Sequence, residues 1–263
     1  MEKERTMRIV FFDSGVGGLT VLREACRRLP AESFLYYADT QNVPYGVHTK
    51  EEVYGFVVGC IDDMLRSHPV RAIVVACNTA TSAAVDELRK RYAFPVIGME
   101  PAVKPALATV RESGKRVLVT ATPLTLKEHK FQQLLRKLEA PSQVDAVGLP
   151  GLVEFAERGV FEGTEVEAYL RESFAPFELE RYGAVVLGCT HFVFFRETIR
   201  TMLPPDVLLM DGNDGTVKQM MRILELEGTS ECSSGSEADI VYMSSLGTDD
   251  DKARLAAGYR RLV

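Results

Sequence analysis

The sequence of 263 residues predicts an α/β protein made of two related units, each with a mainly parallel sheet flanked by helices. Two observations carry this prediction. Short β-branched or apolar runs alternate with longer segments of helical spacing, and the runs are apolar throughout, which indicates strands buried on both faces. In addition, part of the pattern occurs twice along the chain.

The predicted elements alternate between strand and helix, and the series then restarts. The first unit has strands at residues 7–12, 34–38, 72–76 and 95–98, separated by helices at 19–29, 50–65 and 80–92. The second has strands at 116–120, 143–147 and 184–188, with helices at about 124–138, 163–174 and 195–202. Two more strands are expected near 207–210 and 240–243, and the Ser/Gly-rich segment 228–237 is expected to be a loop.

An internal repeat supports the division into two units. Residues 71–78 (RAIVVACN) resemble residues 183–190 (GAVVLGCT), and the cysteines lie 189 − 77 = 112 residues apart. The segment 100–105 (EPAVKP) punctuates the middle, and the tail is too short to stand alone. The predicted domains are therefore 1–100 completed by 211–263, and 101–210.

The composition excludes several classes of protein. The 37 acidic and 31 basic residues give a net charge of −6, and no block of Lys and Arg is long enough to track nucleic-acid phosphates. No apolar run approaches the roughly 20 residues that span a membrane, and the charged N-terminus does not resemble a signal peptide. Five widely spread cysteines make no disulfide framework, so a reducing cytoplasm is expected.

Cys77 and Cys189 stand out among the cysteines because each ends a predicted central strand and is followed by polar residues. We expect the helix N-terminus after Cys77 to lower the pKa of its thiol. Cys189 has His191 two residues on, as a proton partner or orienter. The remaining cysteines lack this context and are expected to be structural or incidental: Cys26, Cys60 and Cys232.

Residues 13–18 (DSGVGG) form a Gly-rich turn that is open to three interpretations. GVGGLT half-matches the dinucleotide motif GxGxxG, with Asp39 about 20 residues further on. However, Thr20 takes the third glycine position, and Asp13 would place a carboxylate beside a pyrophosphate. A plain tight turn is the second interpretation. The third, which we favour, is a turn that binds a small carboxylate, with Asp13 holding a proton or an ammonium group.

Two opposed thiols, one from each unit, suggest inversion of a stereocentre. Such a reaction needs a base on one face of the substrate and an acid on the other. Backbone amides and the hydroxyls of Ser14, Thr79 and Thr190 could stabilise the negative charge that develops on a carboxylate. Neither cysteine belongs to a close pair of zinc-ligand type, and no lysine lies in a recognisable cofactor motif, so no metal or cofactor is expected.

At this point the motifs resemble a known family. FFDSGVGGLTVL, YYADTQNVPYG, VVACNTATSAA and LGCTH, in this order and spacing, are similar to the cofactor-independent glutamate racemases of the aspartate/glutamate racemase family. The resemblance runs from about residue 7 to the final helix. It implies two pseudo-symmetric α/β domains with the active site between them, and interconversion of L- and D-glutamate for peptidoglycan in the bacterial cytoplasm. The resemblance also implies a small-molecule substrate, and it leaves open whether the protein forms a homodimer.

The resemblance assigns roles position by position. Cys77 and Cys189 look like the two acid/base cysteines, each deprotonating one enantiomer. Asp13 matches the carboxylate beside the first cysteine and His191 the histidine beside the second. Glu157, in VEFAERG, is similar to an acidic position near the site. The positions that match substrate-binding residues are Ser14, Pro44, Tyr45, Gly46, Asn78, Thr79, Thr122, Thr125 and Thr190.

Three places depart from the family pattern. Val193 follows Phe192 where the family commonly has proline, Glu128 and Phe131 stand where serine and tyrosine are frequent, and GLPG replaces a cysteine–proline pair. These departures leave an aspartate racemase or a related two-cysteine isomerase as alternatives. A non-catalytic amino-acid-binding protein is a further alternative, although such a protein has no need of two reactive thiols.

Overall fold

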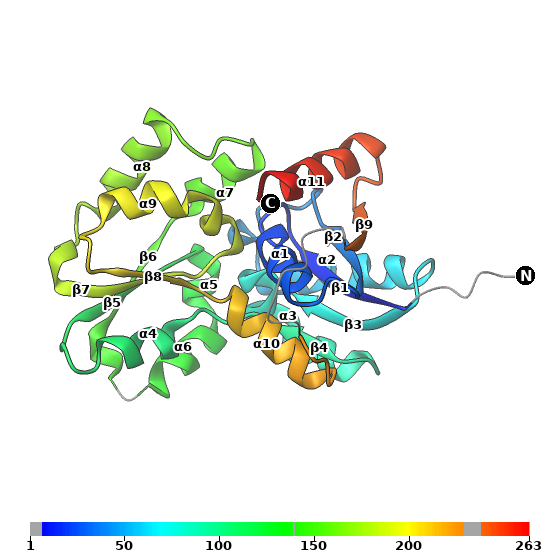
Figure 1. The fold of residues 1–263 in the computed structure, drawn as a ribbon, viewed down its shortest axis with the longest axis horizontal. Coiled ribbons are helices and arrows are strands. Elements are labelled where there is room, and N and C mark those ends of the chain that lie inside the picture. The colour runs from blue at the N-terminus through cyan, green and yellow to red at the C-terminus, as the bar shows by residue number, and fades with distance from the viewer. Residues whose placement is uncertain (1–6, 139, 229–237, 263) are drawn as a thin grey trace, which may run out of the picture.

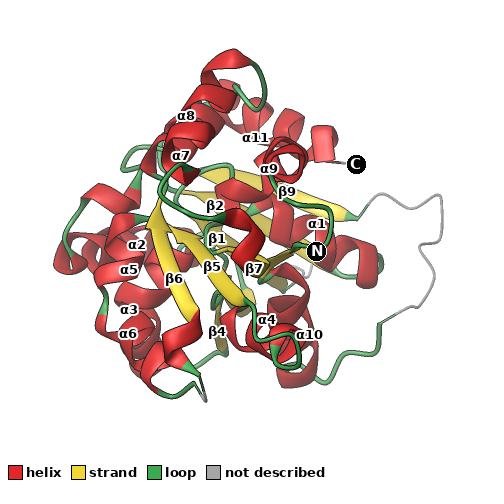
Figure 2. Ribbon diagram, turned by 90° about the vertical axis from the view of Figure 1, so that its left-hand side faces the viewer, coloured by secondary structure: helices red, strands yellow, loops and turns green. Residues whose placement is uncertain are grey.

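The computed structural model describes residues 7–138, 140–228 and 238–262, and it confirms the predicted α/β architecture. Two parallel sheets, of five and four strands, lie in two adjoining units, each with helices packed around its sheet (Figure 1 and Figure 2). The inner strands of each sheet are almost entirely buried, as their apolar sequences predict, whereas the edge strands over residues 144–148, 208–211 and 239–244 are mostly half-buried.

The first sheet has the strand order β4-β3-β1-β2-β9, with every neighbouring pair parallel. Its strands are β1 (Arg8–Asp13), β2 (Ser33–Ala38), β3 (Val70–Val75), β4 (Val96–Gly98) and β9 (Asp239–Ser244). The helices that follow its strands are α1 (Leu19–Arg28), α2 (Lys50–Leu65) and α3 (Asn78–Arg91), with a short 3₁₀ turn η1 (Tyr45–Val47) before α2.

The second sheet has the order β6-β5-β7-β8 and is also parallel throughout. Its strands are β5 (Arg116–Ala121), β6 (Val144–Gly148), β7 (Tyr182–Leu187) and β8 (Leu208–Asp211). Its α-helices are α4 (Val103–Val110), α5 (Pro123–Lys127), α6 (His129–Arg136), α7 (Pro150–Glu157), α8 (Thr164–Phe174) and α9 (Arg196–Met202). Three 3₁₀ turns complete it: η2 (Pro141–Gln143), η3 (Leu179–Arg181) and η4 (Thr190–Phe195).

One sequence prediction for the second unit is wrong. The helix expected over 124–138 is broken into α5 and α6 at Glu128, which has an extended backbone. The break is stabilised because the Gln132 side chain donates a hydrogen bond to the Leu126 carbonyl at the end of α5 (2.8 Å). Helix α4 begins at Val103, within the segment 100–105 between the two units. Pro105 is tolerated there because the first turn of a helix needs no N–H.

The tail returns to the first unit. β9 pairs with β2 in parallel register, with Tyr36 opposite Tyr242. Helix α10 (Asn213–Ile223) packs against α1 and β4, and α11 (Asp249–Leu262) packs against α1 and β9. In Figure 1 the tail, drawn orange to red, accordingly lies beside the blue first unit. The predicted loop beyond Gly228, including Cys232, lies outside the described residues.

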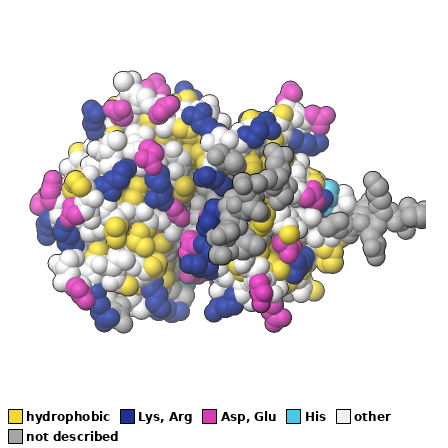
Figure 3. Space-filling view, viewed as in Figure 1, with side chains coloured by type: hydrophobic (Ala, Val, Ile, Leu, Met, Phe, Trp, Pro, Cys, Tyr) yellow, Lys and Arg dark blue, Asp and Glu magenta, His cyan; other side chains and the backbone are white. Residues whose placement is uncertain are grey.

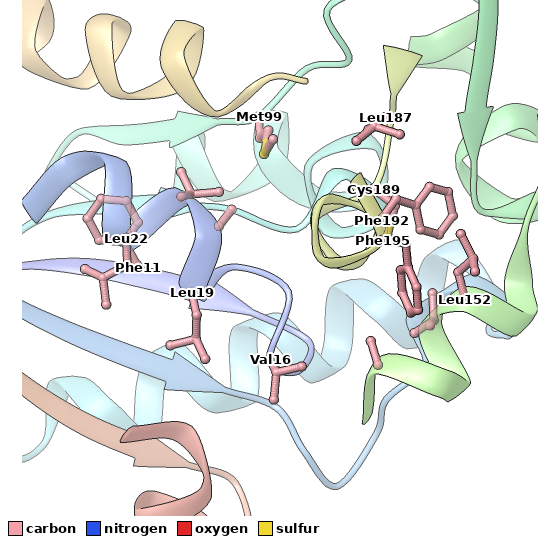
Figure 4. Packing of buried hydrophobic residues seen from close by; sticks show 14 of the residues in the cluster. Phe11, Val16, Leu19, Leu22, Met99, Leu152, Leu187, Cys189, Phe192 and Phe195 are labelled. Carbon is pink, nitrogen blue, oxygen red and sulfur yellow. The ribbon is translucent and has the colours of Figure 1, made fainter. Parts of the chain in front are cut away.

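One apolar core runs through both units. Figure 4 shows Cys189, Phe192 and Leu152 of the second unit in the same buried cluster as Val16 and Leu19 of the first. Groups near the ends of β1 and β7 therefore lie close to one another in this structure.

The molecular surface agrees with the weak net charge. On the face that Figure 3 shows, basic and acidic side chains are interspersed rather than gathered by sign. Within the described ranges, no helix has both the length and the apolar character required to cross a membrane.

Candidate active site

The DSGVGG turn carries a buried carboxylate at the carboxyl end of β1. Asp13 is fully buried, and its Oδ1 accepts a hydrogen bond from the Gly15 amide (3.0 Å) while Oδ2 accepts one from Thr190 Oγ1 (3.1 Å). Burial raises the pKa of Asp13, against the charge of His191 and these hydrogen bonds. Asp13 thus links the first unit to the GCTH segment of the second.

The glycines of this turn permit close approach between the two units. A β-carbon on Gly15 would lie 1.8 Å from Glu157 Oε1, and one on Gly17 would lie 2.5 Å from His191 Nδ1. Both distances are far inside van der Waals contact. Close contacts within the protein thus explain why these two positions are glycine. A bound pyrophosphate is not needed to explain them, which weakens the dinucleotide interpretation of the turn.

Cys77 lies two residues beyond the end of β3 and caps α3. Its Sγ accepts a hydrogen bond from the Ala80 amide (3.4 Å) and lies 3.7 Å from Ser14 Oγ. However, the expected lowering of the thiol pKa is wrong for this state of the protein. Cys77 is only 5% exposed, and burial together with the negative charge of Asp13 raises the pKa of Cys77 to about 12, outweighing the helix amide.

Cys189 follows β7 in the corresponding way, but the repeat is imperfect. A 3₁₀ turn, η4, comes after it in place of the α-helix that follows Cys77, and its side chain makes no capping hydrogen bond. Its Sγ lies instead 3.8 Å from His191 Nδ1, and the residue is 5% exposed. Cys189 is therefore paired with a side chain, whereas Cys77 is paired with a helix terminus.

His191 forms a buried pair with Glu157. Its Nε2 lies 2.6 Å from Glu157 Oε1, which also accepts a hydrogen bond from the Val16 amide (2.8 Å). Burial alone would lower the pKa of His191, but the hydrogen bonds to Cys189 and Glu157 raise it well above its usual value. Burial likewise works to raise the pKa of Glu157, yet His191 and the Val16 amide hold it below its usual value. Both shifts favour the charged forms, an imidazolium facing a carboxylate.

Three threonines meet where α3 approaches α5. Thr79 Oγ1 lies 2.9 Å from Thr122 Oγ1 and 3.2 Å from Thr125 Oγ1, and Thr122 also caps α5. Next to Thr79, both side-chain polar atoms of Asn78 are buried, and neither has a hydrogen-bond partner within the described residues. Because buried amides are nearly always satisfied, Asn78 has capacity to bind a polar ligand.

The segment 44–46 lies beside the threonine cluster, but its side chains contact the protein. Pro44 precedes the η1 turn, and a β-carbon on Gly46 would lie 2.9 Å from Thr122 Cβ, so this glycine lets the turn pack on the threonine cluster. Tyr45 is buried and donates its hydroxyl proton to Asp39 Oδ2 (2.7 Å). The structure thus gives Tyr45 a partner in the protein.

The departures from the family pattern lie in the second unit's packing. Phe131 is buried in the core between α4, α6 and the sheet, Glu128 forms the break between α5 and α6, and Val193 packs in η4 against the shared core.

Sequence reasoning missed other residues of the region. Tyr36 donates a hydrogen bond to the Gly15 carbonyl (2.7 Å), and Arg254 of α11 pairs with Glu157 (3.1 Å).

Comparisons with known proteins identify the family of this chain. The model of the Asp/Glu/hydantoin racemase family matches residues 13–220, which is most of the chain. This chain belongs to that family. It is 48% identical to the glutamate racemase of Halothermothrix orenii over 246 residues, covering 94% of this chain and 95% of the relative. It is 47% identical to glutamate racemase 2 of Bacillus subtilis over 218 residues, covering 83% and 82%.

Solved structures of family members share the fold. The glutamate racemase of Campylobacter jejuni subsp. jejuni matches with a TM-score of 0.81 at 27% identity, covering 98% of this chain and all of that one. The Escherichia coli glutamate racemase, in complex with L-glutamate and the activator UDP-MurNAc-ala, matches with a TM-score of 0.82 at 28% identity, covering 96% and 95%. This racemase therefore has the two-unit architecture of its family.

Proposed function

We propose that this protein is a glutamate racemase that interconverts L- and D-glutamate without a cofactor, using Cys77 and Cys189 as acid and base. The observation that carries the proposal is the placement of two buried thiols at the carboxyl ends of β3 and β7, one in each sheet. The glutamate racemases among its relatives support glutamate as the substrate. An aspartate racemase or another two-cysteine isomerase is the alternative.

In the proposed mechanism one cysteine, as thiolate, removes the α-proton of glutamate. The planar carbanion that results is protonated on its opposite face by the thiol of the other cysteine. The surroundings of Cys77 suit this step, because a thiol whose pKa is about 12 yields a strongly basic thiolate. The imidazolium of His191 beside Cys189 stabilises negative charge on that sulfur.

Stabilisation of the carbanion is the second requirement. An α-proton is weakly acidic, so charge that develops on the substrate carboxylate must be met by hydrogen-bond donors in a site without bulk water. The unpartnered Asn78 amide and the hydroxyls of the Thr79 cluster are suitable donors. Both thiols are 5% exposed, so glutamate can enter only if the two units open.

The test is incubation with L-glutamate in heavy water without added cofactor. New D-glutamate should carry solvent deuterium at Cα from the first turnovers, since its proton comes from the second thiol. Alanine at Cys77 or Cys189 should abolish racemisation in both directions. The matched control is Cys60→Ala, which removes another buried thiol on α2 and should leave the rate within about twofold.

Other outcomes would change the assignment. If aspartate is racemised and glutamate is not, the alternative substrate is the correct one. If either thiol variant keeps the normal rate, the two-thiol mechanism is wrong. Tight binding of glutamate with no racemisation would indicate the amino-acid-binding alternative.

The wider setting belongs to the same proposal. D-glutamate made in the cytoplasm supplies peptidoglycan synthesis, and sedimentation measurements would test whether the protein forms a homodimer. The proposed domains are 1–100 completed by 211–263, and 101–210. The return of β9 to the first sheet supports this division, as does the position of β8 at the edge of the second.

A further inference from the structure

Arg254, on the first turns of α11, joins three segments that are distant in sequence. Its Nη1 donates to Glu157 Oε2 (3.1 Å), its Nε donates to Asp251 Oδ1 (2.9 Å), and Nη2 makes a longer bond to Thr40 Oγ1 (3.4 Å). Thr40 Oγ1 in turn donates to Asp251 Oδ2 (2.9 Å). The guanidinium is thus held in place from its own helix and from the segment after β2.

This contact completes the coordination of the Glu157 carboxylate. Oε1 accepts the Val16 amide and faces His191 Nε2, while Oε2 faces Arg254. A carboxylate held through both oxygens cannot rotate freely, so its Oε1 keeps a fixed direction toward the imidazole. Since the other ring nitrogen of His191 faces Cys189 Sγ, the chain Arg254–Glu157–His191 ends at a proposed acid/base thiol.

An ordinary ion pair at the surface adds little to the stability of a protein, but the pair of Arg254 and Glu157 differs from such a pair in two respects. The Glu157 side chain is 15% exposed and that of Asp251 only 4%, against 35% for Arg254, so both carboxylates are largely shielded from water. The contact also spans 97 residues and joins α11 of the first unit to α7 of the second. Loss of the cation would leave Glu157 with a free oxygen beside His191.

We propose that Arg254 is a positioning residue for the Cys189 half of the reaction, acting through Glu157 and His191. This inference rests on the proposed racemase function. Cys77 has no part in the chain, because its partners are the Ala80 amide and Ser14. Substitution of Arg254 should therefore impair proton transfer at Cys189 and leave proton transfer at Cys77 nearly intact.

Elimination from β-chloroglutamate separates the two halves. A thiolate removes the α-proton, the Cα–H electron pair forms a Cα=Cβ bond, and chloride leaves with the C–Cl pair. The enamine tautomerises, and water converts it to 2-oxoglutarate and ammonia. Only one base is needed, so each Cα enantiomer reports one thiol. The Cys189→Ala variant identifies the enantiomer that depends on Cys189, because elimination of that enantiomer alone is lost.

The decisive variant is Arg254→Gln. Elimination of the Cys189-dependent enantiomer should slow about 10- to 100-fold, the range expected when a catalytic group loses its alignment, while the other enantiomer stays within about twofold. Arg254→Lys, which keeps a cation near Glu157, should restore part of the rate. Lys252→Gln is the matched control on the same helix, since Lys252 pairs with Asp249 at the surface. It should leave both rates unchanged.

Three results would overturn the inference. Equal slowing of both enantiomers by Arg254→Gln and Arg254→Lys would show a general structural role, and thermal unfolding of each variant would reveal it. Unchanged rates for both enantiomers would show that Glu157 holds its direction without the arginine. If the unaltered protein eliminates chloride from both enantiomers, either of these two results refutes only the role of Arg254 and leaves the proposed function standing. If it neither racemises glutamate nor eliminates chloride, the proposed function fails and takes this inference with it.

Discussion

Gly188, immediately before Cys189, has no room for a side chain, and this makes Gly188→Ala a sharp test of the site. A β-carbon there would lie 2.6 Å from the Thr120 carbonyl oxygen, a backbone atom of the neighbouring strand β5. Ordinary contact begins at 3.4 Å, so the two strands must separate by about 3.4 − 2.6 = 0.8 Å. The Gly188 amide also donates to the same oxygen (2.7 Å), and that hydrogen bond would be stretched.

The expected effects follow from this displacement. Overpacking costs about 1–3 kcal/mol and the weakened hydrogen bond about 1 kcal/mol, so the free energy of unfolding should fall by roughly 2–4 kcal/mol. For a chain of this size the Tm should drop by roughly 5–15 °C. Because Cys189 moves with its neighbour by close to 1 Å, kcat/KM for glutamate should fall about 100-fold.

Thermal unfolding and a racemisation assay measure both quantities, and Gly148→Ala supplies the control. Gly148 also ends a strand of the second sheet, β6, but its β-carbon would find its nearest neighbour at 3.5 Å, which is ordinary contact. This control should keep its Tm and activity, with a gain of up to about 1 kcal/mol from the stiffer unfolded chain. A Gly188→Ala protein that melts and racemises like the unaltered one would refute the steric reasoning.

Three further predictions concern the polar groups of the site. The first is that alkylation of Cys77 by iodoacetamide should accelerate about tenfold per pH unit from pH 7 to 10, because the pKa of the buried thiol is about 12. Peptide mass analysis measures the extent of alkylation, and a plateau near pH 8 would contradict the prediction. The pKa of Glu157 is lowered from 4.5, so its stabilising charge is lost as the pH falls through the folded value. The pKa of His191 is raised from 6.5, so its stabilising charge is lost as the pH rises through the folded value. The stability difference between the unaltered protein and Glu157→Gln should therefore be largest between about pH 4.5 and 6.5 in denaturant titrations, and a difference that is constant up to pH 10 would argue against the ion pair. Thr79→Val should raise the KM for glutamate about tenfold and cost about 1 kcal/mol of stability, since it removes one hydroxyl from the threonine cluster, and an unchanged KM would remove Thr79 from the substrate site.

Most of the fold was predictable because parallel strands buried on both faces have a clear apolar signature. β1, β2, β3 and β5 lie within two residues of their predicted bounds, and the return of the tail was also expected. The break at Glu128 was not predictable from periodicity. The apolar spacing on either side of it is continuous, and the hydrogen bond from the Gln132 side chain to the Leu126 carbonyl that accompanies it leaves no trace in that spacing.

The residues of the site were predictable where their role depends on neighbours in the sequence, and not where it depends on residues distant in the sequence. The repeat indicated Cys77 and Cys189 because each cysteine lies two residues beyond the end of its strand. The direction of the Cys77 pKa shift was wrong, because sequence shows the helix terminus but not the extent of burial. Arg254 was missed for a different reason: the spacing of Asp251 and Arg254 is typical of a surface ion pair, and the partners that give it a role lie 97 and 214 residues away.

The position of β9 beside β2 also bears on how the chain is made. During synthesis β2 leaves the ribosome with an unpaired edge of Ser33–Ala38, and its partner is complete only 244 − 38 = 206 residues later. At about 5–20 residues per second the wait is roughly 10–40 s. An apolar strand with a free edge is prone to pair with other chains, so the open edge of β2 exposes the nascent first unit to aggregation until the tail has been made.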